Sequence, residues 1–568
     1  MATTTPELFP ELLASVPSPI RNFLYGVFQL DDLQELHAQA RTISQGPLSR
    51  TVLDLLNIRI QLLTFELERC PRSGPLIVVA NHPFGILDGL VLDAVFFDLR
   101  HDVKILTNSL VAGAHEICDR CIAIDVFHSA YSQTNLRSVR RASEWLREGH
   151  GLAIFPAGEV SHWRHEKRCI SDPPWSNLAA RLALHAQATI VPVYFVGANS
   201  LAFQIAGLVH PGLRTMRLPH ELLNKRGSTI EVRIGNRMAP SDLARQGSIE
   251  NATKYLRARI YMLGHRKIPV CRRPFTASDL RTRCHISIYD ETPGVADAIS
   301  LLEARHRQIV ENGSYRVFAE TGEDIPSILR EIGRLREISF RAAGEGSGKA
   351  SDLDSFDPHY TQLVLWHKQE RCIAGGYRLA WTQDVLPDRG IRGLYTSTLF
   401  RYAPPFFKAI GPSVELGRSF ICTQFQKDYA PLMLLWQAIG RLVAARADAP
   451  VLFGPVSIST AYSDAALELI VSYLQQHRLR TDLAQVVTPR RPFRSRLTRA
   501  ADLRMVAACL HEIEELAVPL AEVNNGLDVP VLLRQYVRLG GRVAAFNVDR
   551  KFSNVLDALL VVDLRETS

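Results

Sequence analysis

One apolar stretch that ends in a histidine constrains this chain more than any other feature of its sequence. Residues 76–80 are all apolar, and they run directly into Asn81 and His82. A short apolar run that is rich in β-branched residues and followed by a turn is typical of a strand buried in a sheet. We therefore expect a buried strand that carries His82 to the edge of a sheet, with Asn81 capping the helix that follows.

A carboxylate follows close behind this histidine. Asp88 lies six positions after His82, within one to two turns of the expected helix, so it can reach back to the imidazole. A histidine held by a carboxylate can take a proton from a hydroxyl or an amine during acyl transfer. On its own, such a pair is more often structural than catalytic.

A second loop of similar character favours the catalytic interpretation. Residues 154–161 again follow a strand-like run, and they form a loop that contains Pro156, Gly158 and one acid, Glu159. Two such loops, each at the end of a strand, are typical of a site at the edge of an α/β sheet.

The two motifs resemble those of the glycerophosphate and lysophospholipid acyltransferases, over about the first half of the chain. Five residues instead of four separate His82 from Asp88, and the acid stands at Glu159 rather than at Ala157. In these respects the pair looks like the sub-branch that includes the lyso-ornithine-lipid O-acyltransferases. The resemblance implies that His82 is the general base, that Asp88 orients it and that Glu159 meets an ammonium group of the acceptor. The substrate-binding positions that it implies are Asn81, Phe155, Pro156, Gly158, Glu159 and Ser161.

The net charge and the composition of the chain indicate where in the cell such an acyl transfer takes place. The 568 residues carry a net charge of +8, and no apolar run approaches the ~18 residues needed to span a bilayer. The basic clusters suit an anionic membrane or a carrier protein, or are simply solvated. We expect a cytoplasmic protein, peripheral on the inner face of the cytoplasmic membrane. No nucleic-acid module is recognisable, and the spacing of the nine cysteines favours neither a metal site nor a disulfide framework.

The order of the expected elements predicts two α/β domains. In the first half, strands alternate with helices, which predicts a largely parallel sheet. A basic stretch with prolines then marks a boundary. We expect a first domain over residues 1–264, a linker over 265–285 and a second domain over 286–568. In the second domain the pattern predicts helices over 299–312, 325–340 and 431–446, and strands over 315–319, 362–366, 373–379, 414–420 and 451–454.

Six charged residues stand out among the apolar neighbours of the second domain. They are Asp354, Asp357, Glu415, Arg336, Arg378 and Arg418. Charges on strands and element ends are not expected to be buried unpaired. They form either a structural ion-pair network or a pocket for a zwitterionic amino acid, in which acids hold ammonium groups and arginines hold the carboxylate. In the second case, a carboxylate such as Glu415 can take the proton of an amine that attacks a thioester.

The second half resembles the GNAT superfamily, specifically the ornithine-acyl-carrier-protein N-acyltransferases and the related autoinducer synthases. The residues that carry this resemblance are Arg336, Phe340, Asp354, Asp357, Arg378, Glu415 and Arg418. Ordinary GNAT enzymes cradle the pyrophosphate of CoA in a glycine-containing loop through its backbone N–H groups. Residues 424–431, at the corresponding place, contain no glycine. The resemblance therefore implies a donor carried on the phosphopantetheine of acyl carrier protein, with no separate cofactor.

Together the two halves resemble the bifunctional ornithine lipid synthases. This resemblance implies an acyltransferase with two activities. The second domain transfers a 3-hydroxyacyl group from acyl carrier protein to the α-amine of ornithine, and the first domain then acylates the 3-hydroxyl of the lyso-ornithine lipid. One alternative is a lysophosphatidic acid acyltransferase fused to an N-acyltransferase for another amino acid, such as glycine. Another is that one half is a degenerate module that binds membrane or carrier protein.

Overall fold

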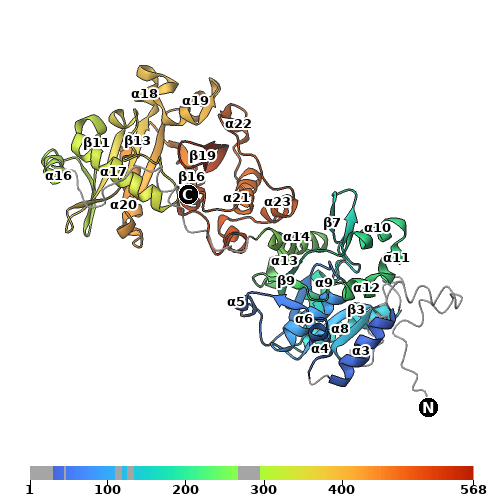
Figure 1. The fold of residues 1–568 in the computed structure, drawn as a ribbon. Coiled ribbons are helices and arrows are strands. Elements are labelled where there is room, and N and C mark those ends of the chain that lie inside the picture. Colours follow the sequence, from blue (N-terminus) through green and yellow to red (C-terminus); the bar gives the residue numbers. More distant parts are fainter. Residues whose placement is uncertain are drawn as a thin grey trace, which may run out of the picture. The chain divides into compact units, whose positions relative to one another are not determined.

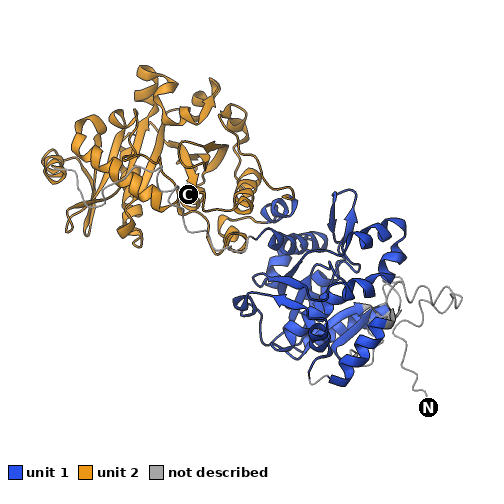
Figure 2. Ribbon diagram, in the orientation of Figure 1, with its two compact units in different colours: residues 1–266, 501–509 blue, residues 267–500, 510–568 orange. Residues whose placement is uncertain are grey.

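The computed structural model describes most of the chain, namely residues 30–43, 46–108, 118–124, 133–266, 294–446 and 448–566. Figure 1 shows its helices and strands, and Figure 2 shows the two compact units into which they divide. Unit 1 contains residues 1–266 and 501–509, and unit 2 contains residues 267–500 and 510–568. The expected linker lies outside the described residues from position 267 onward.

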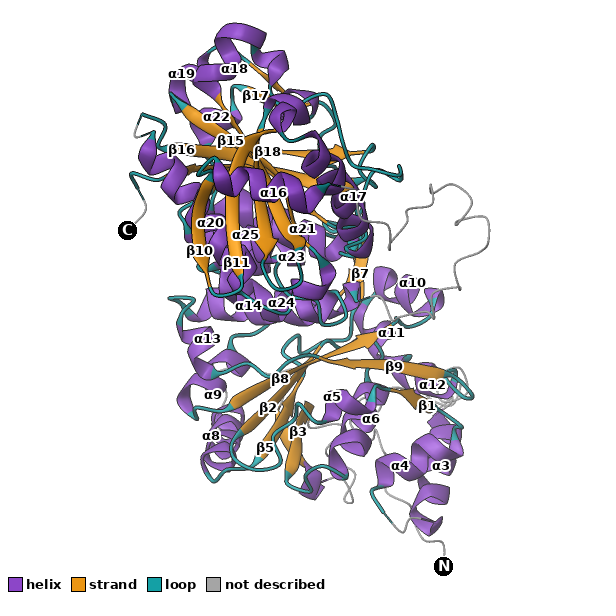
Figure 3. Cartoon of the chain, turned by 90° about the vertical axis from the view of Figure 1, so that its left-hand side faces the viewer, coloured by secondary structure: helices purple, strands orange, loops and turns teal. Residues whose placement is uncertain are grey.

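Unit 1 is built on a seven-stranded sheet, visible in Figure 3. In spatial order its strands are β1 (Arg59–Gln61), β9 (Thr229–Ile234), β8 (Thr189–Val196), β2 (Leu76–Ala80), β5 (Gly151–Ile154), β3 (Val103–Asn108) and β4 (Cys121–Ile124). All neighbours are parallel except β8 and β9. The prediction of a largely parallel sheet is therefore confirmed. Every residue of β2 is buried because helices cover both faces of a parallel sheet, which explains its uninterrupted apolar sequence.

The helices of unit 1 connect and cover these strands. They are α3 (Leu30–Ile43), α4 (Leu48–Leu55), α5 (Thr64–Leu67), α6 (Ile86–Phe97), α8 (Gln133–Arg147), α9 (Leu178–His185), α10 (Leu201–Val209), α11 (Pro211–Met216), α12 (Leu218–Leu223), α13 (Pro240–Ala244) and α14 (Ile249–Met262). A small hairpin, β6 (His162–Arg164) and β7 (Cys169–Ser171), follows the second loop. Within the described residues, no helix is both long and apolar enough to cross a bilayer.

One helix from far along the chain completes unit 1. Helix α23 (Ala501–Ala508) packs on α14, and it buries Leu503, Val506 and Ala507. No sequence pattern separates this segment from the second domain, because an eight-residue amphipathic helix does not reveal which core it covers. The structure groups residues 501–509 with the first unit instead.

Unit 2 is built on an eight-stranded mixed sheet. In spatial order its strands are β10 (Gln308–Asn312), β11 (Tyr315–Thr321), β12 (Thr361–His367), β13 (Cys372–Trp381), β15 (Ser413–Ile421), β16 (Val451–Ile458), β19 (Val555–Asp563) and β18 (Arg542–Asp549). Only β15 and β16 are parallel neighbours. A separate pair, β14 (Phe400–Tyr402) and β17 (Val487–Pro489), lies outside this sheet.

The helices of unit 2 pack along this sheet. They are α16 (Val295–Ala304), α17 (Pro326–Ala342), α18 (Thr382–Arg389), α19 (Pro405–Ile410), α20 (Ala430–Ala445), α21 (Asp464–His477), α22 (Thr481–Ala484), α24 (Ala517–Val523) and α25 (Val531–Arg538). The expected helix over 299–312 is wrong in its second half. Helix α16 ends at Ala304, and residues 308–312 pair with β11 as a hairpin turned at Gly313, whose φ of 54° suits glycine.

Candidate active sites

The first candidate site lies where β2 ends in unit 1. Nδ1 of His82 lies 2.9 Å from Oδ2 of Asp88, which is fully buried at the start of α6. The same carboxylate oxygen accepts hydrogen bonds from the backbone N–H groups of Phe84 and Gly85, at 2.8 and 2.9 Å. Burial raises the pKa of Asp88, and the hydrogen bond from His82 opposes this shift. With Nδ1 facing the carboxylate, Nε2 of the partly exposed ring is the nitrogen that can accept a proton.

The second loop lies against the same imidazole. Strands β2 and β5 are parallel neighbours, so the residues that follow them meet at one edge of the sheet. The ring of Phe155 stacks on that of His82, with centroids 4.3 Å apart. The N–H of Ser161 donates to the carbonyl of His82 at 2.7 Å. The two predicted motifs therefore form one local structure.

A buried aspartate that the sequence did not single out joins these loops. Asp172 accepts hydrogen bonds from the N–H of His82 at 3.2 Å and from Nε1 of Trp175 at 2.9 Å. It also accepts from the hydroxyl of Ser161. Asp172 thus fixes the backbone of His82 and the side chain of Ser161 at once. Its position eleven residues after Ser161 carries no local pattern that could have identified it.

The other predicted residues of this site have structural partners. The side-chain amide of Asn81 exchanges two hydrogen bonds with the backbone of Phe195, at 2.7 and 3.0 Å, so it ties β2 to β8. The prediction that Asn81 caps the helix is wrong, because α6 begins at Ile86 with Gly85 at its N-cap. The carboxylate of Glu159 pairs with Arg214 at 2.8 Å, although the Glu159 side chain remains 60% exposed.

The two small residues of the second loop shape its backbone. Gly158 has a φ of 67°, which favours glycine, and its N–H donates to the carbonyl of Phe155 at 3.1 Å. The carbonyl of Pro156 accepts from the N–H of Ser176 at 2.9 Å. These two positions therefore determine the course of the loop through the backbone.

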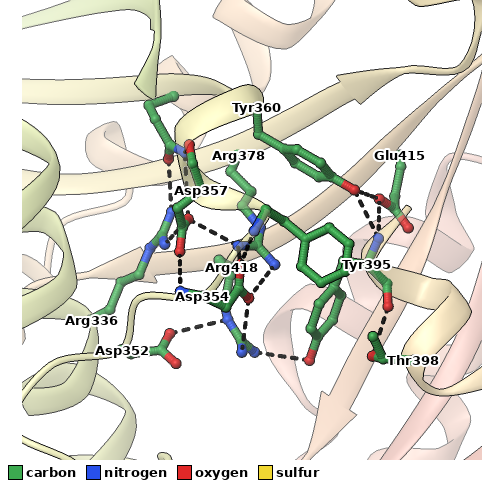
Figure 4. A network of polar contacts seen from close by, with 12 residues as sticks. Arg336, Asp352, Asp354, Asp357, Tyr360, Arg378, Tyr395, Thr398, Glu415 and Arg418 are labelled. Carbon is green, nitrogen blue, oxygen red and sulfur yellow. Dashed lines mark hydrogen bonds and ion pairs between the residues drawn. The ribbon is translucent and has the colours of Figure 1, made fainter. Parts of the chain in front are cut away.

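The second candidate site is the charged cluster of unit 2, which Figure 4 shows. Arg336 on α17 pairs with Asp357 at 2.7 Å and donates to the side-chain oxygen of Gln362 at 2.8 Å. Arg378 on β13 pairs with Asp357 at 2.9 Å and with Asp354 at 2.8 Å. Both guanidinium groups are fully buried. Burial raises the pKa of Asp357, but the charges of Arg336 and Arg378 outweigh it and hold this pKa well below its usual range.

The third arginine extends the cluster along β15. Arg418 pairs with Asp352 at 3.0 Å and lies 3.8 Å from Asp354. It also donates to the hydroxyl of Tyr395 at 3.2 Å. The ring of Phe552 lies 4.9 Å from its guanidinium, and Phe340 packs edge-on against that ring. The cluster thus contains Asp352 and Tyr395, which the sequence did not single out.

Glu415 is not part of this ion-pair network, although the sequence grouped it there. Its fully buried carboxylate accepts hydrogen bonds from the N–H groups of Thr396 and Tyr395, at 2.7 and 3.1 Å. It also accepts from the hydroxyl of Tyr360. Burial raises the pKa of Glu415, and these donors oppose the shift. With Asp352, the five other charges form a cluster of three arginines and three aspartates, whose charges balance without a ligand.

The strand that carries Glu415 separates from its neighbour just beyond it. Strands β15 and β16 pair over three positions only, ending at Glu415 opposite Phe453. The next residue of β16 is Gly454. A Cβ atom at this position would lie 2.1 Å from the carbonyl oxygen of Leu416 on β15, so only glycine fits where the two backbones come this close. Both strands continue for several residues beyond it. Their separation leaves backbone groups to which an extended thioester arm can bond.

Neither site has the donor set of a metal centre. Within the described residues, no group of three or more His, Cys, Asp or Glu side chains is arranged to hold a metal ion.

Comparison with known proteins agrees with this division. Residues 58–267 match the family described as an acyltransferase, and residues 335–437 match the family described as an acetyltransferase (GNAT) domain. The prediction of an acyltransferase-like α/β domain followed by a GNAT-like α/β domain is therefore confirmed. The protein is an enzyme that combines O-acyltransferase and N-acyltransferase domains.

Three curated relatives have names that refer to amino acids or lyso-lipids. A glycine N(alpha)-acyltransferase of Bacteroides thetaiotaomicron is 30% identical over 280 residues, which cover 47% of this chain and 82% of the relative. A lyso-glycine lipid O-acyltransferase of Phocaeicola vulgatus is 22% identical, covering 39% of this chain and 78% of the relative. An L-ornithine N(alpha)-acyltransferase of Rhodobacter capsulatus is 28% identical, covering 42% and 87%. The chain belongs to the acyltransferase family of the glycine N(alpha)-acyltransferases.

Proposed function

We propose that this enzyme builds an amino-acid lipid by two successive acylations, with ornithine as the acceptor. In unit 2, the α-amine of ornithine attacks the thioester of a 3-hydroxyacyl group on acyl carrier protein. The amide C–N bond forms, the C–S bond breaks and the carrier's thiol is released. Glu415 receives the proton of the amine, and Tyr360, whose hydroxyl donates to this carboxylate, connects it to the substrate. The separation of β15 and β16 accommodates the pantetheine arm.

In unit 1, the product of the first step becomes the acceptor. His82 removes the proton of its 3-hydroxyl, whose oxygen attacks a second thioester. The ester C–O bond forms, the C–S bond breaks, and the thiol leaves with the proton that His82 returns. Asp88 holds the imidazole with Nε2 toward the substrate. The observation that carries the proposal is the presence of both machineries in one chain: a His–Asp pair at a sheet edge, and a buried carboxylate beside a strand separation.

The acceptor can be identified by a competition experiment. The full chain is incubated with 3-hydroxyacyl carrier protein and with equal concentrations of ornithine, lysine, glycine and lysophosphatidate, and the products are analysed by mass spectrometry. We expect a singly acylated ornithine that is converted to a diacylated one over time. A diacylated glycine lipid would contradict the choice of ornithine, and it would favour the alternative to which the glycine N(alpha)-acyltransferase relatives point. A lysophosphatidate product would assign a different acceptor to unit 1.

An apolar surface next to the first site supports a membrane location. Helix α10 exposes Leu201, Ile205, Leu208 and Val209, with exposed fractions of 75, 52, 56 and 72%. The helix is held by its buried face, where Gln204 accepts a hydrogen bond from the N–H of Trp163 at 2.9 Å. Residues 210–228, which follow it, contain four Lys or Arg and one Glu. Arg214 and Arg217 are paired with Glu159 and Glu221, so the positive charge in excess is that of Lys225 and Arg226. Apolar residues beside an excess of positive charge are typical of a helix that lies on an anionic bilayer.

We propose that α10 docks on the inner face of the cytoplasmic membrane, where the lyso-lipid resides. Replacing both Ile205 and Val209 by aspartate should weaken binding to phosphatidylglycerol-containing vesicles by at least about tenfold, because the apolar surface of two side chains is no longer buried in lipid. Vesicle co-sedimentation measures this loss. Leu301→Asp, at a side chain that is 51% exposed in unit 2, is the matched control and should bind as the unmodified chain does. Equal loss in both variants would contradict this docking surface.

A further inference from the structure

Three carboxylates outside the ion-pair network gather at one end of the sheet in unit 2. Asp557 lies on β19 opposite Ser457 of β16, whose hydroxyl donates to its Oδ1 at 2.9 Å. On the other side, β18 presents Asn547 opposite Asp557. Asp549, two residues further along β18, lies on the same face of the sheet and is therefore a diagonal neighbour of Asp557.

A loop brings the third carboxylate to the same place. The carbonyl of Ala343 accepts a hydrogen bond from Ser459 at 2.7 Å, and that of Gly346 accepts one from Ser553 at 2.9 Å. The loop between them carries Glu345, so it lies beside the end of β16 and the turn before β19. Burial raises the pKa of Glu345 to about 7.

These three carboxylates lack the cationic partner with which buried carboxylates are normally paired. Asp557 is only 3% exposed, and its Oδ2 has no hydrogen-bond partner among the described residues. Burial, reinforced by the charge of Asp549, raises the pKa of Asp557 to about 8. The guanidinium of Arg418 is near enough to oppose this shift, but it is already paired with Asp352. A buried carboxylate oxygen without a donor is costly, so each such oxygen requires an explanation.

The surroundings favour an alkylammonium ion as the missing partner. Two apolar rings lie beside the three carboxylates. The ring of Phe552 packs on the guanidinium of Arg418, and Phe340 packs on Phe552. An apolar surface of this kind can contact the methylene groups of an amino-acid side chain. The carboxylates do not form a metal-ligating group within the described part of the chain. An ammonium group supplies three N–H donors and a full positive charge.

We propose that Glu345, Asp549 and Asp557 bind the side-chain ammonium of a diamino acid acceptor. This inference rests on the proposed N-acylation in unit 2 and specifies its substrate class. Asp354 and Asp357, to which the sequence assigned this role, are neutralised by arginines and have no charge to spare. Glycine has no second ammonium, so this group of carboxylates selects against it.

Calorimetric titration of the full chain without an acyl donor tests this site directly. L-ornithine should bind at least about tenfold more tightly than L-norvaline, which has the same carbon chain but no side-chain amine, because the charged hydrogen bonds are lost. Binding of ornithine near pH 7.5 should release protons, since the ammonium favours the ionised form of Asp557. Titrations in buffers of different ionisation enthalpy measure this release.

Single substitutions test whether these carboxylates, and not others nearby, bind the ammonium group. Asp557→Asn should remove the preference for ornithine over norvaline and abolish proton release from this position. Asp549→Asn, at a half-buried side chain, should weaken the preference in the same direction, and it provides a second test if the first variant does not fold. Asp563→Asn, on the same strand but paired with Arg565, should leave binding unchanged.

Two results would overturn the inference. One is equal affinity for ornithine and norvaline in the unmodified chain. The other is a preference for ornithine that survives in both Asp557→Asn and Asp549→Asn. Because these titrations contain no thioester, they remain informative if the chain proves to transfer no acyl group to any amino acid, which would refute the proposed function itself.

Discussion

Replacing His82 by alanine should lower the rate of O-acylation by about 10²–10⁴-fold, the usual contribution of a positioned general base. The structure gives the reason: two backbone N–H groups hold the carboxylate of Asp88, and this carboxylate orients the imidazole of His82. The measurement is ester formation by the full chain supplied with lyso-lipid and acyl donor. Formation of the amide in unit 2 should continue at its normal rate, so the variant should accumulate the singly acylated product.

A second His–Asp pair in the same unit provides the control. Nδ1 of His150 lies 3.1 Å from Oδ2 of Asp102, and its ring stacks on Trp145. This pair has the same imidazole–carboxylate contact as His82 and Asp88, but Asp102 is also paired with Arg100 at 2.6 Å. His150→Ala should retain ester formation. If His150→Ala and His82→Ala lost activity equally, a folding defect would explain both, and the assignment of His82 as base would have no support.

The parts that the sequence predicted are those in which a local pattern has a single physical explanation. The unbroken apolar run before His82 requires a strand that is covered on both sides, and β2 is such a strand. Alternation of strands and helices required parallel pairing, and only β8 and β9 depart from it. The contact of His82 with Asp88 was also predicted, although it does not follow from helix geometry: α6 begins at Ile86, and the turn before it brings His82 to the carboxylate.

The parts that the sequence missed depend on contacts between distant segments. Asn81 has the right chemistry for a cap, but its amide is used by Phe195, which lies 114 positions away. The hydroxyl of Tyr360 reaches Glu415 across 55 positions, and nothing around either residue indicates this. Asp352 stands two positions before Asp354, but its pairing with Arg418 joins segments that are far apart in the sequence. Similar reasoning explains why residues 308–312 became a strand, since hairpin pairing with β11 outweighs a weak helical pattern.

Replacing Arg378 by methionine should destabilise the centre of unit 2 by about 3–5 kcal/mol, because it leaves Asp354 and Asp357 without the cation between them. Methionine preserves most of the side-chain volume, so the loss comes mainly from charge. Hydrogen exchange of the β12 and β13 amides, followed by mass spectrometry, measures the free energy of local opening. The contribution should persist at neutral pH and disappear as the pH falls toward the lowered pKa of Asp357, because its carboxylate is then protonated.

Arg446→Met is the matched control for this effect. Arg446 also pairs with an aspartate, Asp384, at 2.8 Å and stacks on Trp381, but both charged side chains are about half exposed. Its removal should cost less than about 1 kcal/mol, as for surface pairs in general. Unchanged protection of β13 in Arg378→Met would mean that the buried charges are not coupled as the distances imply. Ester formation from supplied lyso-lipid should be normal in both variants, because His82 and Asp88 belong to the other unit, and amide formation should fall only in Arg378→Met.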